Sequence, residues 1–435
     1  MTELFIFLEN HFRLTMKSSS SQLNTSNLPQ RYRTNFAHLY FDIAWFGVLS
    51  GSAINFITVY ATRIGATGVQ IGLFGATTAL VSLIFALPAG RWLDKPGRTH
   101  SVFWASIVYR LGFLFYIPIP WLLNAKEQIW VLVLLSLLMG IPFVALSVGS
   151  SALFADSVPV EWRALVAGRR NIVFSVMFMI TSLACGYFLD HILFPLNYQI
   201  VFFMGFVGGA MSSYHLYFIK PVPAVISHPI TTTFSIHKEP NPRGFPVWLT
   251  AIRIDVLATK FRSTLIVMMI FHIAQYLALP VFPLYFVRYL KLSDLNLGIG
   301  TALFYFTVLI GSTQLNRLVG KLGHKDVTGW GVVGMAVYPA LLALSSLVWQ
   351  YYVVSIVGGL AWALVGGAST NYVIENCPEK DRSSHLAWYN IVLNASILIG
   401  SLLGPLIAST ISLPIALLFF GLFRGLAGIA ILKWG

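Results

Sequence analysis

The stretch Gly90–His100 reads GRWLDKPGRTH and concentrates charge in a chain that has little of it. It holds Arg91, Asp94, Lys95 and Arg98, whereas only 10% of the 435 residues are Asp, Glu, Lys or Arg. A soluble protein carries about a quarter charged residues. Long apolar runs lie on both sides, LVSLIFALPA before the stretch and SVFWASIVYRLGF after it. The stretch is therefore a polar turn between two segments that cross a membrane.

Apolar runs of about twenty residues recur along the chain, each long enough to cross roughly 30 Å of hydrocarbon as a helix. Lipid offers no hydrogen bonds to the backbone, and the alternating polarity of barrel strands is absent. We expect an all-α polytopic membrane protein with twelve transmembrane helices. The predicted helices are Leu39–Ala61, Val69–Ala89, Ser101–Leu123, Ile129–Phe154, Asn171–Leu189, Tyr198–Ile219, Thr264–Val287, Leu297–Leu315, Gly329–Val348, Tyr351–Ile374, Leu386–Ser409 and Leu413–Leu432.

The formal net charge of +13 records topology rather than a nucleic-acid partner. On the predicted helices, 22 of the 28 Lys and Arg residues fall on one side of the membrane. Positive residues mark the cytoplasmic side. We therefore expect a protein integral to the cell membrane (plasma or inner), with both termini and the central loop in the cytoplasm. Met16 is a second candidate start beside Met1.

The chain also repeats itself, as duplicated architectures do. The stretch ADSVPVEWRALVAGRRNIV (Ala155–Val173) aligns at one constant offset with IENCPEKDRSSHLAWYNIV (Ile374–Val392). The matched positions include Pro159 with Pro378, Arg163 with Arg382 and Asn171 with Asn390. Elsewhere YATRIG parallels YFVRYL. The repeat predicts two six-helix bundles related by a pseudo-two-fold axis along the membrane normal.

The repeat divides the chain into four parts. We expect a cytoplasmic N-terminal arm at 1–38, an N-terminal bundle at 39–219, a central loop at 220–262 and a C-terminal bundle at 263–435. The end of the loop, FPVWLTAIRIDVLATKFR, is either a helix lying on the cytoplasmic leaflet or a plain linker.

The opening stretch resembles a motif of the major facilitator superfamily, Gly-x-x-x-Asp-(Arg/Lys)-x-Gly-(Arg/Lys), between the second and third helices. The resemblance extends to the twelve helices, the central loop and the repeat. It implies a secondary transporter that works by alternating access, with the motif as a latch between the bundles. The latch residues are Gly90, Asp94, Lys95, Gly97, Arg98 and Asp156, with Lys321 and Glu375 in a degenerate second copy. A plain charged turn is the other interpretation.

By the same resemblance, the first, fourth, seventh and tenth helices line a central cavity. Each of these helices carries a polar or aromatic stripe at the spacing of one helix face. The candidate cavity residues are Asn55, Ser147, Ser151, His272, Gln275, Tyr276, Trp362 and Ser369. Helix packing explains small polar residues equally well, so the alternative of a structural role stays open.

Three charged residues fall inside predicted helices. Asp42 lies three residues into the first predicted helix, where the helix dipole stabilises a carboxylate, and we expect a structural role for it. Arg110 and Arg424 lie near the middle of the third and twelfth helices, with no acid at their depth. We expect backbone carbonyls or lipid headgroups as their partners, with an anionic substrate as the alternative for Arg110.

The function expected is movement of a small solute, and proton coupling is left open. No catalytic cluster, metal site or phosphate-binding loop is evident, so we expect no enzyme, no cofactor and no metal. Cys185 and Cys377 indicate neither a disulfide nor a metal site. The partners expected are a small-molecule substrate, membrane lipid and, for a coupled carrier, protons. A receptor or sensor with a transporter fold and a lipid-modifying membrane enzyme are the alternatives.

Measured against the family that the chain resembles, two signatures are missing. The fourth helix lacks the basic residue that many proton antiporters carry, and the fifth, SLACGYFLD, lacks the Gly-Pro pair typical of drug antiporters, so the resemblance disfavours drug efflux without excluding it.

Overall fold

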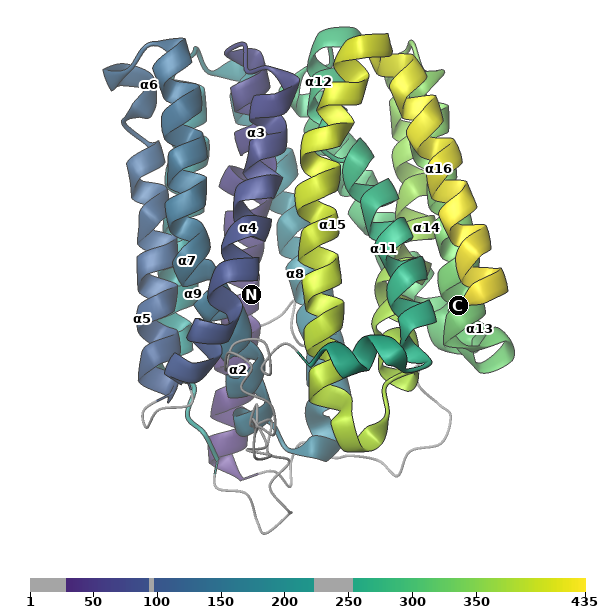
Figure 1. The fold of residues 1–435 in the computed structure, drawn as a ribbon. Coiled ribbons are helices and arrows are strands. Elements are labelled where there is room, and N and C mark those ends of the chain that lie inside the picture. The colour runs from purple at the N-terminus through teal and green to yellow at the C-terminus, as the bar shows by residue number, and fades with distance from the viewer. Residues whose placement is uncertain (1–28, 94–97, 223–252) are drawn as a thin grey trace, which may run out of the picture.

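The computed structural model describes residues 29–93, 98–222 and 253–435. Its regular elements in these ranges are helices, and they divide into an N-terminal and a C-terminal half (Figure 1). The elements of the N-terminal half are α2 (Gln30–Leu49), the π-helical turn η2 (Ser50–Ile54), α3 (Asn55–Arg63), α4 (Gly68–Leu93), α5 (Arg98–Leu111), η3 (Gly112–Tyr116), α6 (Ile119–Leu122), α7 (Ala125–Ser157), α8 (Val160–His191) and α9 (Leu196–Tyr217).

The C-terminal half repeats this order. Its elements are η4 (Ile254–Ala258), α11 (Phe261–Ala278), α12 (Val281–Leu284), η5 (Tyr285–Tyr289), α13 (Asp294–Ala343), α14 (Val348–Glu375), η6 (Glu379–Asp381), α15 (Arg382–Ile411) and α16 (Leu413–Trp434). Pro159 precedes α8 and Pro378 precedes η6. The repeated prolines therefore mark equivalent helix starts.

The described residues contain eleven continuous helical segments that are long and apolar enough to cross a membrane. One of them, α13, has 50 residues, and its backbone leaves the helical region at Gly323, with φ 81° and ψ 164°. A positive φ is accessible to glycine because it has no Cβ. The predicted eighth and ninth helices thus lie on either side of Gly323, and the all-α fold with twelve membrane-spanning helices is confirmed.

The first helix begins earlier than predicted, at Gln30 instead of Leu39. The residues from 30 to 38 are too polar for a hydropathy argument, yet they continue the helix after Pro29. Asp42 therefore lies about three turns inside α2 and not at its start. The expectation that the helix dipole stabilises this carboxylate was wrong.

The two halves meet through α4 and α15 and through α8 and α13. Glycine allows this close approach. A Cβ at Gly72 would lie 2.0 Å from the carbonyl oxygen of Ser401, and one at Gly298 would lie 2.7 Å from that of Ser182. Small residues serve the same purpose in other membrane helix pairs.

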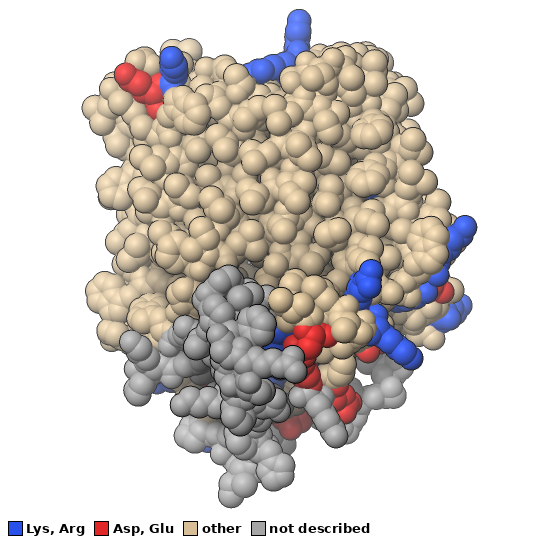
Figure 2. Space-filling view, viewed as in Figure 1, with Lys and Arg blue, Asp and Glu red and all other residues tan. Residues whose placement is uncertain are grey.

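One end of the bundle carries the start of α2 and the end of α16, and we call it the termini end (Figure 1). The turn between α3 and α4 lies at the opposite end. On the face shown in Figure 2, Lys, Arg, Asp and Glu gather toward these two ends, and a band of other residues crosses the middle. A band without charge is the surface that hydrocarbon requires.

Candidate functional site

An ion pair joins the two halves at the end opposite the termini. Arg63, the last residue of α3, donates from Nε and Nη2 to Oδ1 of Asp294, at 3.0 and 2.9 Å. Its Nη2 also donates to the carbonyl oxygen of Leu292 at 2.9 Å. Asp294 is the first residue of α13 and is buried. Because three hydrogen bonds hold one guanidinium, this contact fixes the orientation of both partners.

A second carboxylate strengthens the same junction. Asp190, at the end of α8, accepts hydrogen bonds from the backbone N–H groups of Asp294 and Leu295 at 2.9 and 3.1 Å. The start of a helix carries unpaired N–H groups and partial positive charge, so an anion is stabilising there. Tyr198 donates its hydroxyl to Asp294 at 3.3 Å. We call Arg63, Asp190, Tyr198 and Asp294 the interhalf clamp.

The other half contributes an equivalent arginine. Arg288 donates from Nη2 to the carbonyl oxygen of Ala66 at 2.5 Å. Arg63 and Arg288 occupy the same position in the repeated sequences YATRIG and YFVRYL. Each arginine thus crosses to the opposite half. Sequence reasoning counted both only as charges on the far side of the membrane, although the repeat already paired them.

The predicted cavity residues on the first and fourth helices are accessible in part. Asn55 is half-buried and donates from Nδ2 to the hydroxyl of Ser182 at 3.2 Å. Ser147 and Ser151 are exposed, and Ser151 donates to the carbonyl oxygen of Ser147 at 3.2 Å. Their hydroxyls add polarity to one exposed face of α7.

On the seventh helix, His272 and Gln275 are buried. His272 Nε2 lies 3.0 Å from the hydroxyl of Tyr389 on α15. Gln275 Oε1 is buried and has no hydrogen-bond partner among the described residues. Tyr276, together with Trp362 and Ser369 of α14, is half-buried. Whether these side chains bind a solute stays a prediction.

Asp42 has partners that sequence reasoning did not find. Its Oδ1 lies 3.4 Å from Arg110 Nη2, and its Oδ2 lies 3.4 Å from Arg170 Nη2. The hydroxyl of Ser212 donates to Oδ1 at 2.6 Å. The expectation that Arg110 has no acid at its depth was therefore wrong. Four helices, α2, α5, α8 and α9, meet at this carboxylate.

Arg110 also binds two hydroxyls, Ser106 at 2.7 Å and Ser213 at 3.2 Å. Arg424, by contrast, has no acid beside it among the described residues. It is buried and donates to the carbonyl oxygens of Gln275 and Met335 at 3.1 and 3.3 Å. Carbonyl partners are what the sequence led us to expect for Arg424.

With this geometry in place, comparison with known proteins identifies the family. The model of the Major Facilitator Superfamily matches residues 41–256 and 264–435. The chain belongs to the Major Facilitator Superfamily. The predictions of an integral membrane protein and of a transporter of this superfamily are confirmed.

Curated relatives of this superfamily member include resistance proteins. The chain is 26% identical over 133 residues to the class H tetracycline resistance protein of Pasteurella multocida, an alignment that covers 30% of this chain and 33% of the relative. It is 22% identical over 374 residues to the quinolone resistance protein NorA of Staphylococcus aureus, covering 86% and 88%. The tetracycline-resistance alignment thus spans about a third of that protein.

Among solved structures, the superfamily fold recurs over nearly the whole chain. The xylose transporter XylE from E. coli, in a partially occluded inward-open conformation, has a TM-score of 0.67 at 14% identity and covers 93% of this chain and 98% of its own. The nucleoside transporter NupG has a TM-score of 0.62 at 12% identity, with 93% and 99% covered. At these identities the likeness shows the fold.

The superfamily motif lies mostly outside the described residues. Asp94, Lys95 and Gly97 fall there, as does the side chain of Arg98. Asp156 is exposed, and its carbonyl oxygen accepts a hydrogen bond from the backbone N–H of Val222 at 3.0 Å. The latch therefore stays a prediction.

The second copy of the motif is described. Lys321 is exposed, and Glu375 Oε1 lies 2.6 Å from His324 Nδ1. This contact joins two positions of the degenerate motif within the C-terminal half.

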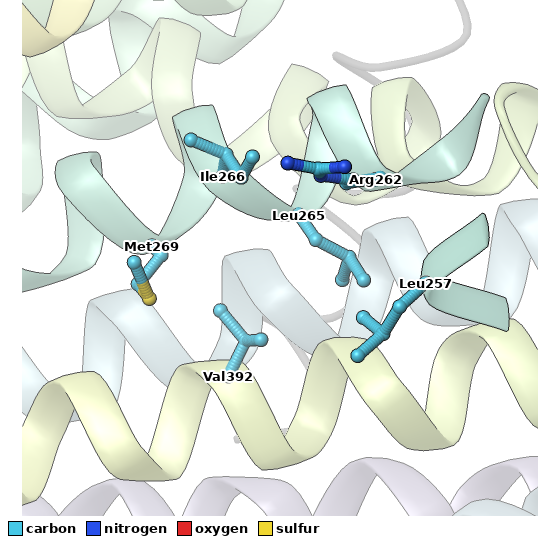
Figure 3. Close-up of a pocket in the computed structure, with 6 residues that line it drawn as sticks. All are labelled: Leu257, Arg262, Leu265, Ile266, Met269 and Val392. Atoms are coloured by element: carbon cyan, nitrogen blue, oxygen red, sulfur yellow. The ribbon is translucent and has the colours of Figure 1, made fainter. Parts of the chain in front are cut away.

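A separate groove of about 310 Å³ opens between η4, α11 and α15 (Figure 3). Arg262 is the charged residue of its lining, and the other lining side chains are apolar. The lining residues are Leu257, Arg262, Leu265, Ile266, Met269 and Val392. The groove does not include the predicted cavity residues. No group of three metal-ligating side chains occurs in the part of the chain that the structure describes.

Proposed function

We propose that the chain moves a small organic solute across the membrane by alternating access and that the structure is the state open toward the termini end. The observation that supports this most directly is the position of the interhalf clamp. In the part of the chain that the structure describes, the hydrogen bonds between the halves gather at the end opposite the termini. XylE, which shares this fold, was solved in an inward-open conformation, and that is consistent with this proposal.

The chain's own residues supply the parts that such a cycle needs. In this state Arg63 and Asp294 close the opposite end, and a solute approaches from the termini end. The positive residues counted above put the termini end in the cytoplasm. A solute shifts the equilibrium between the two states only by its difference in affinity for them. The clamp must break when the opposite end opens, so its strength sets part of the free-energy difference between the two states in the absence of solute.

The predicted cavity residues indicate an organic solute with hydrogen-bonding groups and an apolar surface. Asn55, His272 and Gln275 offer neutral polar groups, and Tyr276 and Trp362 offer aromatic surface. Ligand sites commonly combine an apolar lining with a few placed polar groups.

Export of aromatic compounds is a more specific candidate. The similarity to resistance proteins, including NorA over 86% of this chain, favours it. The missing basic residue of the fourth helix and the missing Gly-Pro pair of the fifth helix count against it. A comparison of efflux and uptake in vesicles of both orientations decides the direction.

The experiment that tests transport uses a reversible closure of the clamp. Arg63→Cys and Asp294→Cys are combined and joined by a cleavable bismaleimide in proteoliposomes, and counterflow of labelled solutes is measured before and after cleavage. A solute is first chosen by its thermal stabilisation of the purified protein. We expect flux to stop on cross-linking and return on cleavage, with solute binding retained throughout.

Each single cysteine variant treated with the same reagent is the control. Flux through the cross-linked protein would contradict alternating access at this clamp. Binding without counterflow in the untreated protein would instead support a receptor. Collapsing a pH gradient during the same assay tests proton coupling.

A further inference from the structure

Two guanidinium groups share one carboxylate inside the N-terminal half. Arg110 and Arg170 each approach one oxygen of Asp42, and both contacts are 3.4 Å long. Charge-assisted N–H···O bonds are usually about 2.7–2.9 Å. The shortest bond to Asp42 comes instead from Ser212, at 2.6 Å. The cluster therefore holds one positive charge that the carboxylate does not neutralise, in a place where charge is costly.

The surplus charge belongs to Arg170 rather than to Arg110. The side chain of Arg110 is 5% exposed, and its donors are also used by Ser106 and Ser213. The side chain of Arg170 is 20% exposed, and Asp42 is the one hydrogen-bond acceptor described for it. The Nε atoms of both arginines are buried without a partner among the described residues, so the two differ in the greater exposure of Arg170 and in the hydroxyls that Arg110 binds. Arg170 thus keeps free donors on a partly accessible guanidinium.

The position of Arg170 relates it to the predicted cavity face. Its guanidinium carbon lies 5.3 Å from the ring centre of Phe154 on α7. Phe154 follows Ser147 and Ser151 at the spacing of one helix face. Both serines are exposed, so this face of α7 is a polar, accessible surface. Arg170 lies about 15 Å along α8 from Val160, the first residue of this helix, and borders this surface.

The repeat places a matching contact in the other half. Asn171 aligns with Asn390, so the residues before them, Arg170 and Tyr389, are also equivalent. Arg170 contacts Asp42 on the first helix of its half, and Tyr389 contacts His272 on the first helix of its own half. Equivalent positions therefore carry a cation in one half and a neutral hydrogen-bonding pair in the other.

We propose that Arg170 binds an oxyanion of the transported solute, such as a carboxylate, phosphate or sulfonate, and that His272 and Tyr389 bind its neutral polar part. The planar guanidinium offers paired donors that match an oxyanion. Asp42 and the solute compete for Arg170, and Asp42 retains its contacts with Ser212 and Arg110 when the solute binds. This assignment rests on the proposed function because it names the substrate class of the same site.

The test compares anionic ligands with a neutral one in detergent, where binding is measured without flux. Benzoate, phenyl phosphate and benzenesulfonate are compared with benzamide by thermal stabilisation of the purified full chain. We expect at least one anion to bind the wild type, with affinity reduced about tenfold or more in Arg170→Gln. Arg170→Lys keeps the positive charge but lacks the paired donors of a guanidinium. Its anion affinity should lie between those of the wild type and Arg170→Gln.

Two further variants separate ligand binding from a structural role. Arg169→Gln removes the neighbouring charge and should leave anion affinity unchanged. Asp42→Asn removes the competing carboxylate and should tighten anion binding, an effect that loss of structure would not produce. Circular dichroism and gel filtration check that each variant is folded. If Arg170→Gln does not fold, Arg170→Lys is compared with the wild type in its place.

Three results would overturn the assignment: equal binding of benzamide and the anions, anion binding that does not change in Arg170→Gln and Arg170→Lys, or no binding of any anion by the wild type. Phosphatidylglycerol is tested against phosphatidylcholine in mixed micelles. Stabilisation by phosphatidylglycerol alone, lost in Arg170→Gln, would assign a lipid headgroup and overturn the solute. Anion binding without counterflow would refute transport alone, and counterflow of a neutral solute unaffected by Arg170→Gln would refute this site alone.

Discussion

Arg63 Nη2 lies 2.9 Å from Asp294 Oδ1, so one ion pair joins the first membrane-spanning helix of the N-terminal half to the second of the C-terminal half. Asp294 is nearly enclosed, while the Arg63 side chain is 30% exposed. Water therefore screens the pair less than it screens a surface salt bridge, and water can still reach the pair when the halves part. Both properties suit a contact that must form and break in each transport cycle.

Loss of this ion pair should open the end opposite the termini. Hydrogen bonds to charged groups contribute about 1.5–3 kcal/mol, so Arg63→Ala should shift the population toward the open state about tenfold or more. A cysteine at the buried position Thr62 reports the change through its rate of labelling by a membrane-impermeant maleimide. Arg253→Ala breaks an exposed pair within the C-terminal part and serves as the control. An unchanged labelling rate in Arg63→Ala would contradict the clamp.

Removal of the cap at the start of α13 should have two separable effects. Asp190→Ala removes the acceptor for two backbone N–H groups and should cost about 0.5–2 kcal/mol. Because Asp190 belongs to the other half, the variant should also raise labelling at position 62. Ser293→Ala removes the local cap, in which Ser293 Oγ accepts from the N–H of Asn296 at 3.2 Å. It should lower thermal stability without raising labelling, and equal labelling in the two variants would refute the role of Asp190 between the halves.

A methyl group at Gly72 should separate α4 from α15. The added Cβ would lie 2.0 Å from a backbone oxygen, which cannot move aside as a side chain can. We expect Gly72→Ala to lower the thermal unfolding midpoint and the rate of counterflow. Gly168→Ala is the matched control, because a Cβ there would meet no atom within 4 Å. A helical glycine replaced by alanine in open space should gain about 0.5–1 kcal/mol. Wild-type behaviour of Gly72→Ala would show that α4 and α15 are not packed this closely.

Cys377 should be unreactive in the folded protein. Burial raises the pKa of its thiol to about 11, and Sγ donates to the carbonyl oxygen of Val373 at 3.3 Å. The thiolate is the reactive form, so alkylation at pH 7 should be slow and rise about tenfold per pH unit up to pH 11. Mass spectrometry after maleimide treatment measures it, with Cys185→Ser isolating the signal. Rapid alkylation of the native protein at pH 7 would contradict the burial of Cys377.

The repeat made the two-bundle architecture predictable from sequence. It also contains pairings of residues that our sequence analysis did not use. The repeat aligned Pro159 with Pro378, and the structure places both directly before helix starts, although the predicted helices began later, at Asn171 and Leu386. The same alignment paired Arg63 with Arg288, and both cross to the opposite half. What the alignment could not supply is the acceptor, because Asp294 and Ala66 are brought into place by packing between halves.

The polar start of α2 shows where hydropathy is insufficient. The residues from Gln30 to His38 are helical but not apolar, so the predicted helix began too late and Asp42 was placed at its end. Pro29 was the available signal, since proline is favoured at helix starts. With Asp42 placed too shallow, its contact with Arg110 could not be anticipated. Arg170 was missed because it was counted with the charges of a loop.

The cap that Asp190 provides to α13 has a thermodynamic consequence for the whole cycle. When the halves part at that end, the first amides of α13 lose their hydrogen bonds to Asp190, and the carboxylate of Asp294 loses those from Arg63. Water must then hydrate these groups instead. Opening therefore takes up water at that end. The balance between the two states should respond to osmotic stress, with excluded solutes such as sucrose favouring the state in which the end opposite the termini is closed.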